Sequence, residues 1–327
     1  MNTSFGNQCR VFLDAKLSIR LNAVLISFIL LFSCAKEEVI EYEVGIDISY
    51  ITSRDLPGNP AELKILGIGN SFTEDAMALL PYLLDSAHIY NVKLGILSRG
   101  GASLEDHLTN YRRKAPVYVF KVTRENLWYI ISDQYTINDA INFSDWDIII
   151  LQQVSKLSGQ VQSYQPYLNR LIKTIDDNCS NTNTVFGWHM TWAYASNYVN
   201  RDFGNYNYDQ WEMYTRIVNA VKVMQSETGI KIIIPSGTAI QNLRNTPLND
   251  PPMDLTGDGL HIMSGVGRYT LSCTWFQELI SPALGIGVAG NKYRVQSGMS
   301  VTDNSYIICQ QAAIQACNNK FEVTTGY

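Results

Sequence analysis

A serine, an aspartate and a histidine in this sequence have the types and settings that nucleophilic catalysis requires. Ser71 follows the apolar run 64–69 and precedes a helical pattern, so it stands at a strand-to-helix turn, where α/β proteins place ligand-binding groups. The helix N-terminus behind it offers backbone N–H groups and a partial positive charge to a developing oxyanion. The turn by itself fits a structural role equally well, because serine is also a favoured helix cap.

Asp258 and His261 supply the other two groups. They lie three residues apart in a Gly-rich segment just before another helical pattern. A carboxylate at this offset can accept the imidazole Nδ1–H and orient the ring, which leaves Nε2 to take the proton of a serine hydroxyl. The chain has four histidines, and only His261 has an acidic residue at that offset on a predicted loop. The others are expected to be structural or lie in a predicted helix: His88, His107 and His189.

The elements that must position these groups alternate between β-type runs and amphipathic helical stretches. Such alternation is typical of a parallel sheet covered on both faces, so we expect one α/β domain over residues 62–327, a three-layer α/β/α sandwich with a five-stranded parallel sheet. Segment 115–143 is too long for a simple connection, which predicts an insertion or a lid. The predicted strands are 64–69, 92–97, 147–152, 184–188 and 231–235, and the predicted helices are 74–88, 161–178, 209–227, 264–279 and 303–318.

The N-terminus has the layout of a secretory signal. Three basic residues precede the apolar run 23–32, which then stops at Cys34. This run is shorter than the roughly 18 apolar residues of a membrane-spanning helix. We therefore predict a removable signal peptide over residues 1–33 and a tether over residues 34–61, where the sequence lacks a sustained apolar period.

The end of that run, Leu31 to Cys34, resembles the lipobox of bacterial lipoproteins. The resemblance implies that Cys34 receives lipid and anchors the chain to a membrane of the cell envelope. The alternative is an ordinary signal peptide with a chance cysteine at this position. The residues that follow Cys34, Ala35 to Glu38, resemble a short signal for export to the outer cell surface.

Charge and composition exclude several function classes. Loss of residues 1–33 removes three basic residues and one acidic residue, which changes the formal net charge from −5 to −7. An acidic chain is a poor candidate for nucleic-acid binding, which demands clustered Lys and Arg. The cysteines match no zinc pattern, and Gly265 stands where a calcium loop beginning at Asp254 would need its bidentate glutamate. We therefore predict no metal and no cofactor.

Taken together, these motifs resemble the SGNH hydrolase superfamily, also called GDSL-like esterases, and in particular its exported bacterial lipoproteins that carry an uncharacterised domain. Residues 69–72 take the place of the family's Gly-Asp-Ser block, with Asn70 for Asp. Residues 258–261 fit its Asp-x-x-His block. The resemblance implies a flavodoxin-like fold and a catalytic set of Ser71, Asp258 and His261.

The same resemblance implies an oxyanion hole of three donors. Two are the backbone N–H groups of Ser71 and of Gly101, which lies in a second family block at residues 99–103. The third is an asparagine amide in the family, whereas this chain has Gln152 and Gln153 after the third predicted strand. A glutamine amide carries the same donor on a longer stem, so Gln153, or else Gln152, is expected to fill the role.

Aromatic residues follow the fourth predicted strand on the edge of the sheet where Ser71 lies. Trp188 and Trp192 would suit stacking on sugar rings, although aromatic side chains also supply much of any core. The predicted function is hydrolysis of acyl esters, most simply O-acetyl groups on glycans. The alternatives are a non-catalytic glycan-binding lipoprotein on the same fold and a lipase or thioesterase that acts on long acyl chains.

Overall fold

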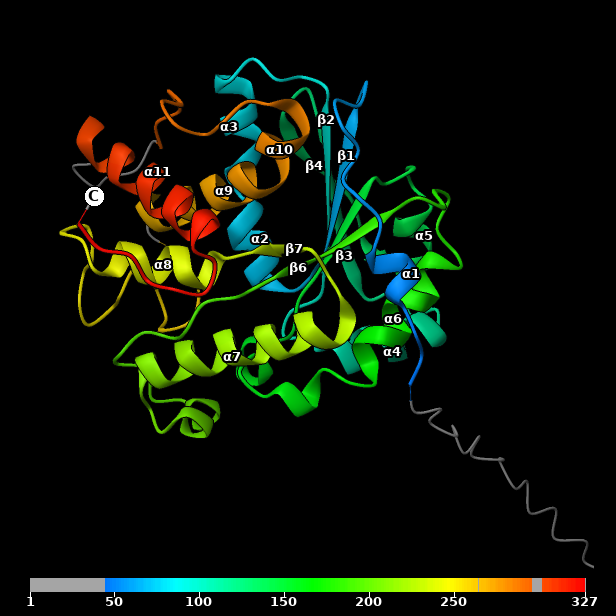
Figure 1. The fold of residues 1–327 in the computed structure, drawn as a ribbon, viewed down its shortest axis with the longest axis horizontal. Coiled ribbons are helices and arrows are strands. Elements are labelled where there is room, and N and C mark those ends of the chain that lie inside the picture. The colour runs from blue at the N-terminus through cyan, green and yellow to red at the C-terminus, as the bar shows by residue number, and fades with distance from the viewer. Residues whose placement is uncertain (1–44, 264, 296–301, 327) are drawn as a thin grey trace, which may run out of the picture. The chain divides into compact units, whose positions relative to one another are not determined.

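A seven-stranded sheet runs through the centre of the molecule. The computed structural model describes residues 45–263, 265–295 and 302–326 (Figure 1). The strand order is β4-β3-β2-β1-β5-β6-β7. The strands are β1 Leu63–Gly69, β2 Val92–Ser98, β3 Tyr118–Arg124, β4 Leu127–Tyr135, β5 Ile148–Leu151, β6 Val185–His189 and β7 Ile232–Ile234.

Five of these strands form the parallel part of the sheet. The pairs β1–β2, β1–β5, β5–β6 and β6–β7 are all parallel, and the five strands coincide with those predicted from sequence. Their side chains are almost all buried, as expected for a parallel sheet with helices on both faces. The strand order reverses at β1, so the turn after β1 lies at the switch point where open α/β sheets bind ligands.

The segment predicted as an insertion or lid is an extension of the sheet, so the expected count of five strands is wrong by two. β3 pairs antiparallel with β2, and β4 pairs antiparallel with β3. The two strands are joined by Glu125 and Asn126, whose φ angles of 50° and 56° fit a tight hairpin turn. Buried aromatic and β-branched residues of β3 attach the hairpin to the core, since such residues pack well on a pleated surface.

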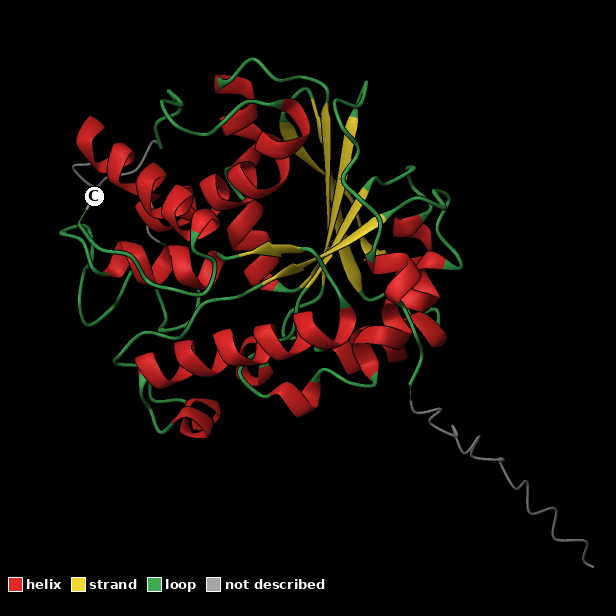
Figure 2. Cartoon of the chain, viewed as in Figure 1, coloured by secondary structure: helices red, strands yellow, loops and turns green. Residues whose placement is uncertain are grey.

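Helices cover the two faces of the sheet (Figure 2). One layer contains α2 Ser71–Met77, α3 Leu80–Ser86, α8 Ser236–Arg244, α9 Gly265–Trp275, α10 Ser281–Leu284 and α11 Asp303–Asn318, with a π-helical turn Phe276–Ile280 between α9 and α10. The opposite layer contains α1 Ser49–Thr52, α4 Leu104–Arg112, α5 Ile137–Ile141, α6 Tyr167–Asp176 and α7 Gln210–Thr228. Short 3₁₀ turns occur at Ser155–Leu157, Val161–Ser163 and Arg201–Tyr206. No helix in the described part of the chain is long and apolar enough to cross a membrane.

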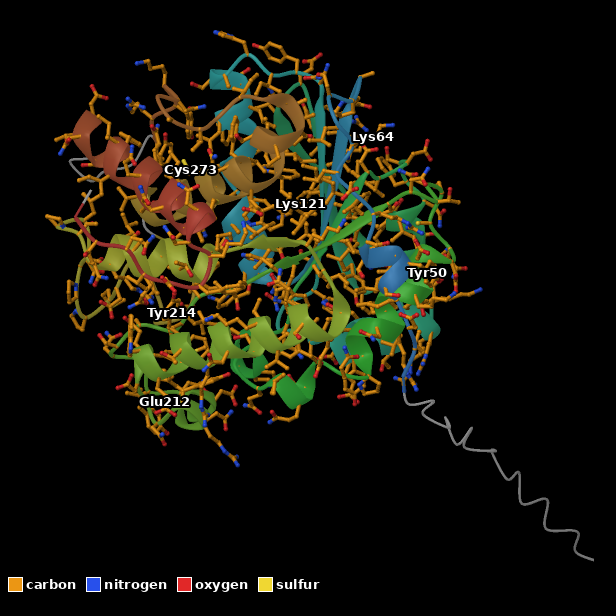
Figure 3. All side chains as sticks on the ribbon, in the orientation of Figure 1. Tyr50, Lys64, Lys121, Glu212, Tyr214 and Cys273 are labelled. Carbon is orange, nitrogen blue, oxygen red and sulfur yellow. The ribbon has the colours of Figure 1, made fainter. Side chains whose placement is uncertain are left out.

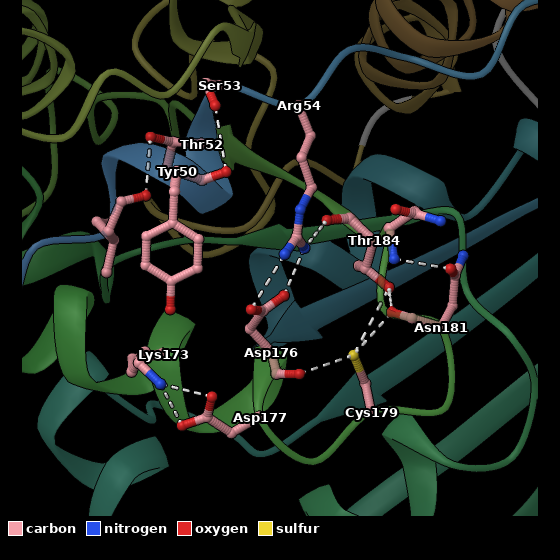
Figure 4. A network of polar contacts seen from close by, with 12 residues as sticks. Tyr50, Thr52, Ser53, Arg54, Lys173, Asp176, Asp177, Cys179, Asn181 and Thr184 are labelled. Atoms are coloured by element: carbon pink, nitrogen blue, oxygen red, sulfur yellow. Dashed lines mark hydrogen bonds and ion pairs between the residues drawn. The ribbon is translucent and has the colours of Figure 1, made fainter.

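The described part of the predicted tether packs on the fold. Ile48 and Ile51 are buried in the core, and the Thr52 hydroxyl donates to the carbonyl oxygen of Thr228 at 2.6 Å. Arg54 donates to the Asp176 carboxylate at 3.2 Å (Figure 4). From residue 45 onward the segment is therefore part of the domain and does not act as a free linker. The predicted signal peptide, residues 1–33, and Cys34 lie outside the described residues.

Candidate active site

Ser71 is the first residue of α2, directly beyond the C-terminal end of β1. The helix cap is Asn70, whose side-chain oxygen accepts the Phe72 N–H at 3.0 Å. This excludes the alternative interpretation of Ser71 as the cap and leaves its hydroxyl available for other contacts. Gly69 lets the side chains of Thr73 and Gln152 pack closely against the backbone before Ser71. A Cβ at Gly69 would lie 2.2 Å from the Thr73 hydroxyl and 2.9 Å from the Gln152 side chain.

A short closed loop carries Asp258 and His261. An isolated bridge joins Thr256 to Ile262, and the Asp258 carboxylate accepts the backbone N–H of Leu260 and of His261 at 3.0 and 2.8 Å. Gly259 has a φ of 90°, and a Cβ at this residue would lie 2.3 Å from the Tyr198 ring. The segment Asp258 to His261 therefore folds so that the Asp258 carboxylate is held next to the backbone and the ring of His261.

The structure brings Ser71, His261 and Asp258 together although the serine is 190 residues from the histidine. Ser71 Oγ lies 2.7 Å from His261 Nε2, and His261 Nδ1 lies 2.6 Å from Asp258 Oδ2. Because an ionised carboxylate only accepts, Nδ1 carries the proton and Nε2 accepts from the serine hydroxyl. This is the arrangement in which an imidazole can act as the base for a serine nucleophile.

Asp258 remains ionised in this setting. Partial burial opposes its charge, but hydrogen bonds from the His261 ring and from the backbone N–H groups of His261 and Leu260 outweigh that cost and lower the pKa of Asp258. The side chains of His261 and Asp258 are 32% and 47% exposed. The three groups therefore lie at the surface, within reach of a ligand.

Two backbone N–H groups beside Ser71 are available to an oxyanion. Ser71 N–H is one of the first donors of α2, which have no acceptor within the helix. Gly101, in the turn between β2 and α4, has a φ of 67°. Within the described residues neither N–H donates to a protein acceptor. The Asn70 amide donates to the carbonyl oxygen of Ala102 at 3.1 Å, which ties the Gly101 turn to the turn that carries Ser71.

Gln153 does not complete this donor set. Its amide nitrogen donates to the carbonyl and hydroxyl oxygens of Ser163 at 3.0 and 3.1 Å. Its amide oxygen accepts the backbone N–H of Leu104 and of Val154. All of its hydrogen-bonding capacity is thus used within the fold, so the expectation of an oxyanion donor at Gln153 is corrected.

Gln152 acts on the site through Asn70. Its amide nitrogen donates to Asn70 Oδ1 at 2.8 Å, and its amide oxygen accepts from the Thr73 hydroxyl at 2.6 Å. That oxygen also lies 3.0 Å from Nδ1 of His189. Burial lowers the pKa of His189 to about 3, so the whole network is uncharged. The one sign of this network in the sequence is Asn70, which stands where the Gly-Asp-Ser block has an aspartate.

Trp188 and Trp192 do not present their faces to a ligand, because both are buried. Trp188 packs against Tyr164, with ring centroids 5.0 Å apart. Trp192 stacks on Phe72 at 4.2 Å, and its indole N–H donates to the carbonyl oxygen of Leu260 at 2.8 Å. The expected role in substrate stacking is therefore corrected: Trp192 supports the loop that holds His261, and Trp188 belongs to the core.

The chain belongs to the family described as Domain of unknown function (DUF4886), which it matches over residues 64–316. It is similar to the crystal structure of a DUF4886 family protein from Bacteroides uniformis, with 36% identity and a TM-score of 0.73. That match covers 80% of this chain and 97% of the other. No protein of curated function matches the sequence.

Two more distant solved structures also match the chain. One is LAE5, an alpha/beta hydrolase enzyme from the metagenome of Lake Arreo, with 11% identity, a TM-score of 0.44, and coverage of 66% of this chain and 94% of that one. The other is the acetyl xylan esterase AlAXEase, with 13% identity, a TM-score of 0.43, and coverage of 65% and 98%.

Proposed function

We propose that this protein is a serine esterase of the SGNH type that hydrolyses acyl esters. The observation that carries the proposal is the continuous contact from Ser71 Oγ through the His261 ring to Asp258, with distances of 2.7 and 2.6 Å. A hydroxyl that touches the free nitrogen of a carboxylate-bound imidazole is an activated nucleophile. The two unengaged N–H groups beside it supply the charge stabilisation that acyl transfer requires.

The reaction proceeds in two halves. His261 Nε2 takes the Ser71 proton as Oγ attacks the ester carbonyl carbon, and the N–H groups of Ser71 and Gly101 hold the oxyanion. His261 then returns the proton to the departing alcohol, which leaves an acyl group on Ser71. A water molecule, deprotonated by His261, releases the acid and restores the serine. Asp258 stabilises the imidazolium formed in each half.

The location that we propose is the cell envelope, with lipid on Cys34 as the anchor. Acylated glycans are abundant targets for an enzyme so placed, and O-acetyl groups are the simplest substituents of this kind. The proposed location and the resemblance to SGNH esterases both favour glycan esters as the substrate class.

Hydrolysis of a short acetyl ester by the purified protein tests the activity. Ser71→Ala is expected to lower kcat by at least about a thousandfold, because no other group in the site replaces the nucleophile. The matched control is Ser155→Ala, since Ser155 is buried and its hydroxyl bonds to Tyr194; this variant should keep most of the activity. Retention of activity by Ser71→Ala would contradict the proposal.

A further inference from the structure

A polar cavity of about 210 Å³ lies against α2, the helix that begins with Ser71, and has no part in the mechanism above. Three of its lining residues come from α2 and its C-terminal cap: Glu74, Asp75 and the cap residue Ala78. They follow Ser71 by three, four and seven positions, so they lie on the same face of the helix as Ser71. The cavity therefore extends along α2 from the end that carries the nucleophile.

The hairpin that extends the sheet forms the opposite wall. Lys121 of β3 and Trp128 of β4 line the cavity together with Ile96 of β2. Lys121 Nζ lies 3.1 Å from the Glu74 carboxylate, and the Trp128 indole N–H donates to the carbonyl oxygen of Ala78 at 3.3 Å. Figure 3 shows Lys121 where the sheet meets the helical layer that contains α2. The hairpin is thus attached to α2 at Glu74 and, one turn further on, at Ala78.

Arg268 connects the cavity to the histidine loop. Its Nη2 lies 2.6 Å from Asp75 Oδ1, and its Nε donates at 2.9 Å to the carbonyl oxygen of Ile262, the residue after His261. Arg268 therefore links a wall of the cavity to the loop that carries His261.

The lining has a specific hydrogen-bonding character. Its two cations, Lys121 and Arg268, balance its two carboxylates, so the cavity has no net charge. Asp75 is only 6% exposed, and its Oδ2 has no hydrogen-bond partner. A buried polar atom of this kind costs free energy unless a ligand or water satisfies it. Lys121 retains unused N–H donors, since an ammonium has three, and Trp128 adds an aromatic ring.

We propose that this cavity is the subsite for the alcohol part of the ester, and that this alcohol is a neutral, polyhydroxylated ring such as a sugar residue. Hydroxyl groups both donate and accept, so they satisfy the Asp75 carboxylate and the two cations together, while the Trp128 ring contacts the C–H face. The inference rests on the proposed esterase function and narrows its substrate class.

The same lining disfavours other substrates. A long acyl chain would remove four charged side chains from water without giving them hydrogen bonds, which is costly. A charged sugar would bring an unbalanced charge into a cavity whose own charges already cancel. The volume is also several times the ~30 Å³ share of one water molecule yet below the ~300 Å³ of drug-sized sites, which fits a single ring better than a long chain.

Binding to the Ser71→Ala protein tests the subsite without turnover. Calorimetric titration with methyl β-glucoside and methyl β-xyloside should show binding, and methyl β-glucuronoside should bind at least about tenfold more weakly. Trp128→Ala should weaken glucoside binding about tenfold, as the loss of an aromatic contact implies, and Lys121→Met should weaken it in a protein with the hairpin ring intact. The control is Trp211→Ala, an exposed tryptophan outside the cavity. Absence of glycoside binding, or equal loss in the Trp211→Ala control, would overturn the inference.

A kinetic comparison separates failure of the subsite from failure of the proposed function. For the enzyme with Ser71 intact, Trp128→Ala and Lys121→Met should each lower kcat/KM for an O-acetylated methyl glucoside about tenfold and leave kcat/KM for ethyl acetate nearly unchanged. Equal losses for both esters would contradict the sugar subsite while the esterase function stands. Glycoside binding that depends on Trp128 in a protein without any esterase activity would support the subsite and contradict the proposed function.

Discussion

The buried indole of Trp192 donates its N–H to the carbonyl oxygen of Leu260 at 2.8 Å. Leu260 directly precedes His261, and the Trp192 ring stacks on Phe72, which directly follows Ser71. One side chain therefore contacts the neighbours of both the serine and the histidine. Through these contacts Trp192, in the loop that follows β6, fixes the separation between Ser71 and His261.

Replacement of Trp192 by Phe tests this positioning role. The variant keeps a ring against Phe72 but loses the donor, so Leu260 is left without its partner. We expect a fall of about tenfold in kcat with little change in KM, and a loss of about 1 kcal/mol in the free energy of unfolding. The control is Trp188→Phe, equally buried but packed on Tyr164, which should lose stability and keep kcat. An unchanged kcat in Trp192→Phe would refute the role.

The hydrogen bond of the Asn70 amide predicts that replacement of Asn70 by aspartate lowers both stability and activity. Asn70→Asp removes the donor to the Ala102 carbonyl and sets a carboxylate oxygen against it. We expect the free energy of unfolding to fall by about 1–3 kcal/mol, together with slower ester hydrolysis because the Gly101 turn is released. Urea unfolding and steady-state kinetics measure both effects.

The matched control for that substitution is Asn142→Asp. Asn142 is exposed and also donates its amide to carbonyl oxygens, those of Asn138 and Asn178. At such a site the change should stay within about 0.5 kcal/mol. Equal effects of the two substitutions would show that the Asn70 network has no special importance.

Two buried histidines predict a loss of stability in mild acid. Burial lowers the pKa of His107 to about 4 and that of His189 to about 3, whereas an unfolded histidine titrates near 6.5. Protons therefore favour the unfolded chain as the pH falls below about 6.5, and the free energy of unfolding should fall by about 1.4 kcal/mol per pH unit for each histidine until the folded pKa is reached.

Urea unfolding between pH 7.5 and 5 measures this slope. His107→Gln retains a group that can hydrogen-bond to Tyr118 and removes one titrating site, so its slope below about pH 6.5 should be smaller than that of the wild type by about 1.4 kcal/mol per unit. Above about pH 7.5 the two proteins should show the same slope. Parallel curves across the whole range would contradict the account of His107.

Membrane attachment is predicted to depend on Cys34. Cys34→Ser should release the protein from membranes, because the acyl chains supply the anchoring at about 0.8 kcal/mol per buried CH₂. Fractionation of cells that express each form, with the mass of the mature N-terminal peptide, measures the effect. A Cys34→Ser protein that stays in the membrane fraction would show that the uncleaved apolar segment is the anchor.

The sequence predicted the parallel strands well, because they depend on local patterns. Apolar runs such as 64–69 and the turn residues after them indicate strands and their ends directly. The pairing of Asp258 with His261 is also local, since three residues separate them. Their approach to Ser71 is not local, and the sequence indicated it only through the resemblance to the Asp-x-x-His block of SGNH hydrolases.

The parts that the sequence did not predict depend on tertiary contacts. Gln153 and Gln152 are adjacent and chemically identical, and only the fold decides that one bonds to Ser163 and the other to Asn70. Tryptophan is a residue type that often stacks on ligands, but the Trp192 side chain lies inside the core. The hairpin of β3 and β4 carries the signals of strands, yet its attachment to β2 as part of the sheet is a non-local choice.

The most direct test of the central claim is covalent labelling by a fluorophosphonate, read as the intact mass and as the modified peptide. Ser71 Oγ should take one phosphonyl group, because only a hydroxyl activated by a base such as His261 reacts readily with this reagent. Ser71→Ala and His261→Ala proteins that still unfold cooperatively should remain unmodified. A single adduct on the peptide that contains Ser71 is the result we predict. An unmodified wild-type protein, or an adduct that persists in Ser71→Ala, would contradict the account.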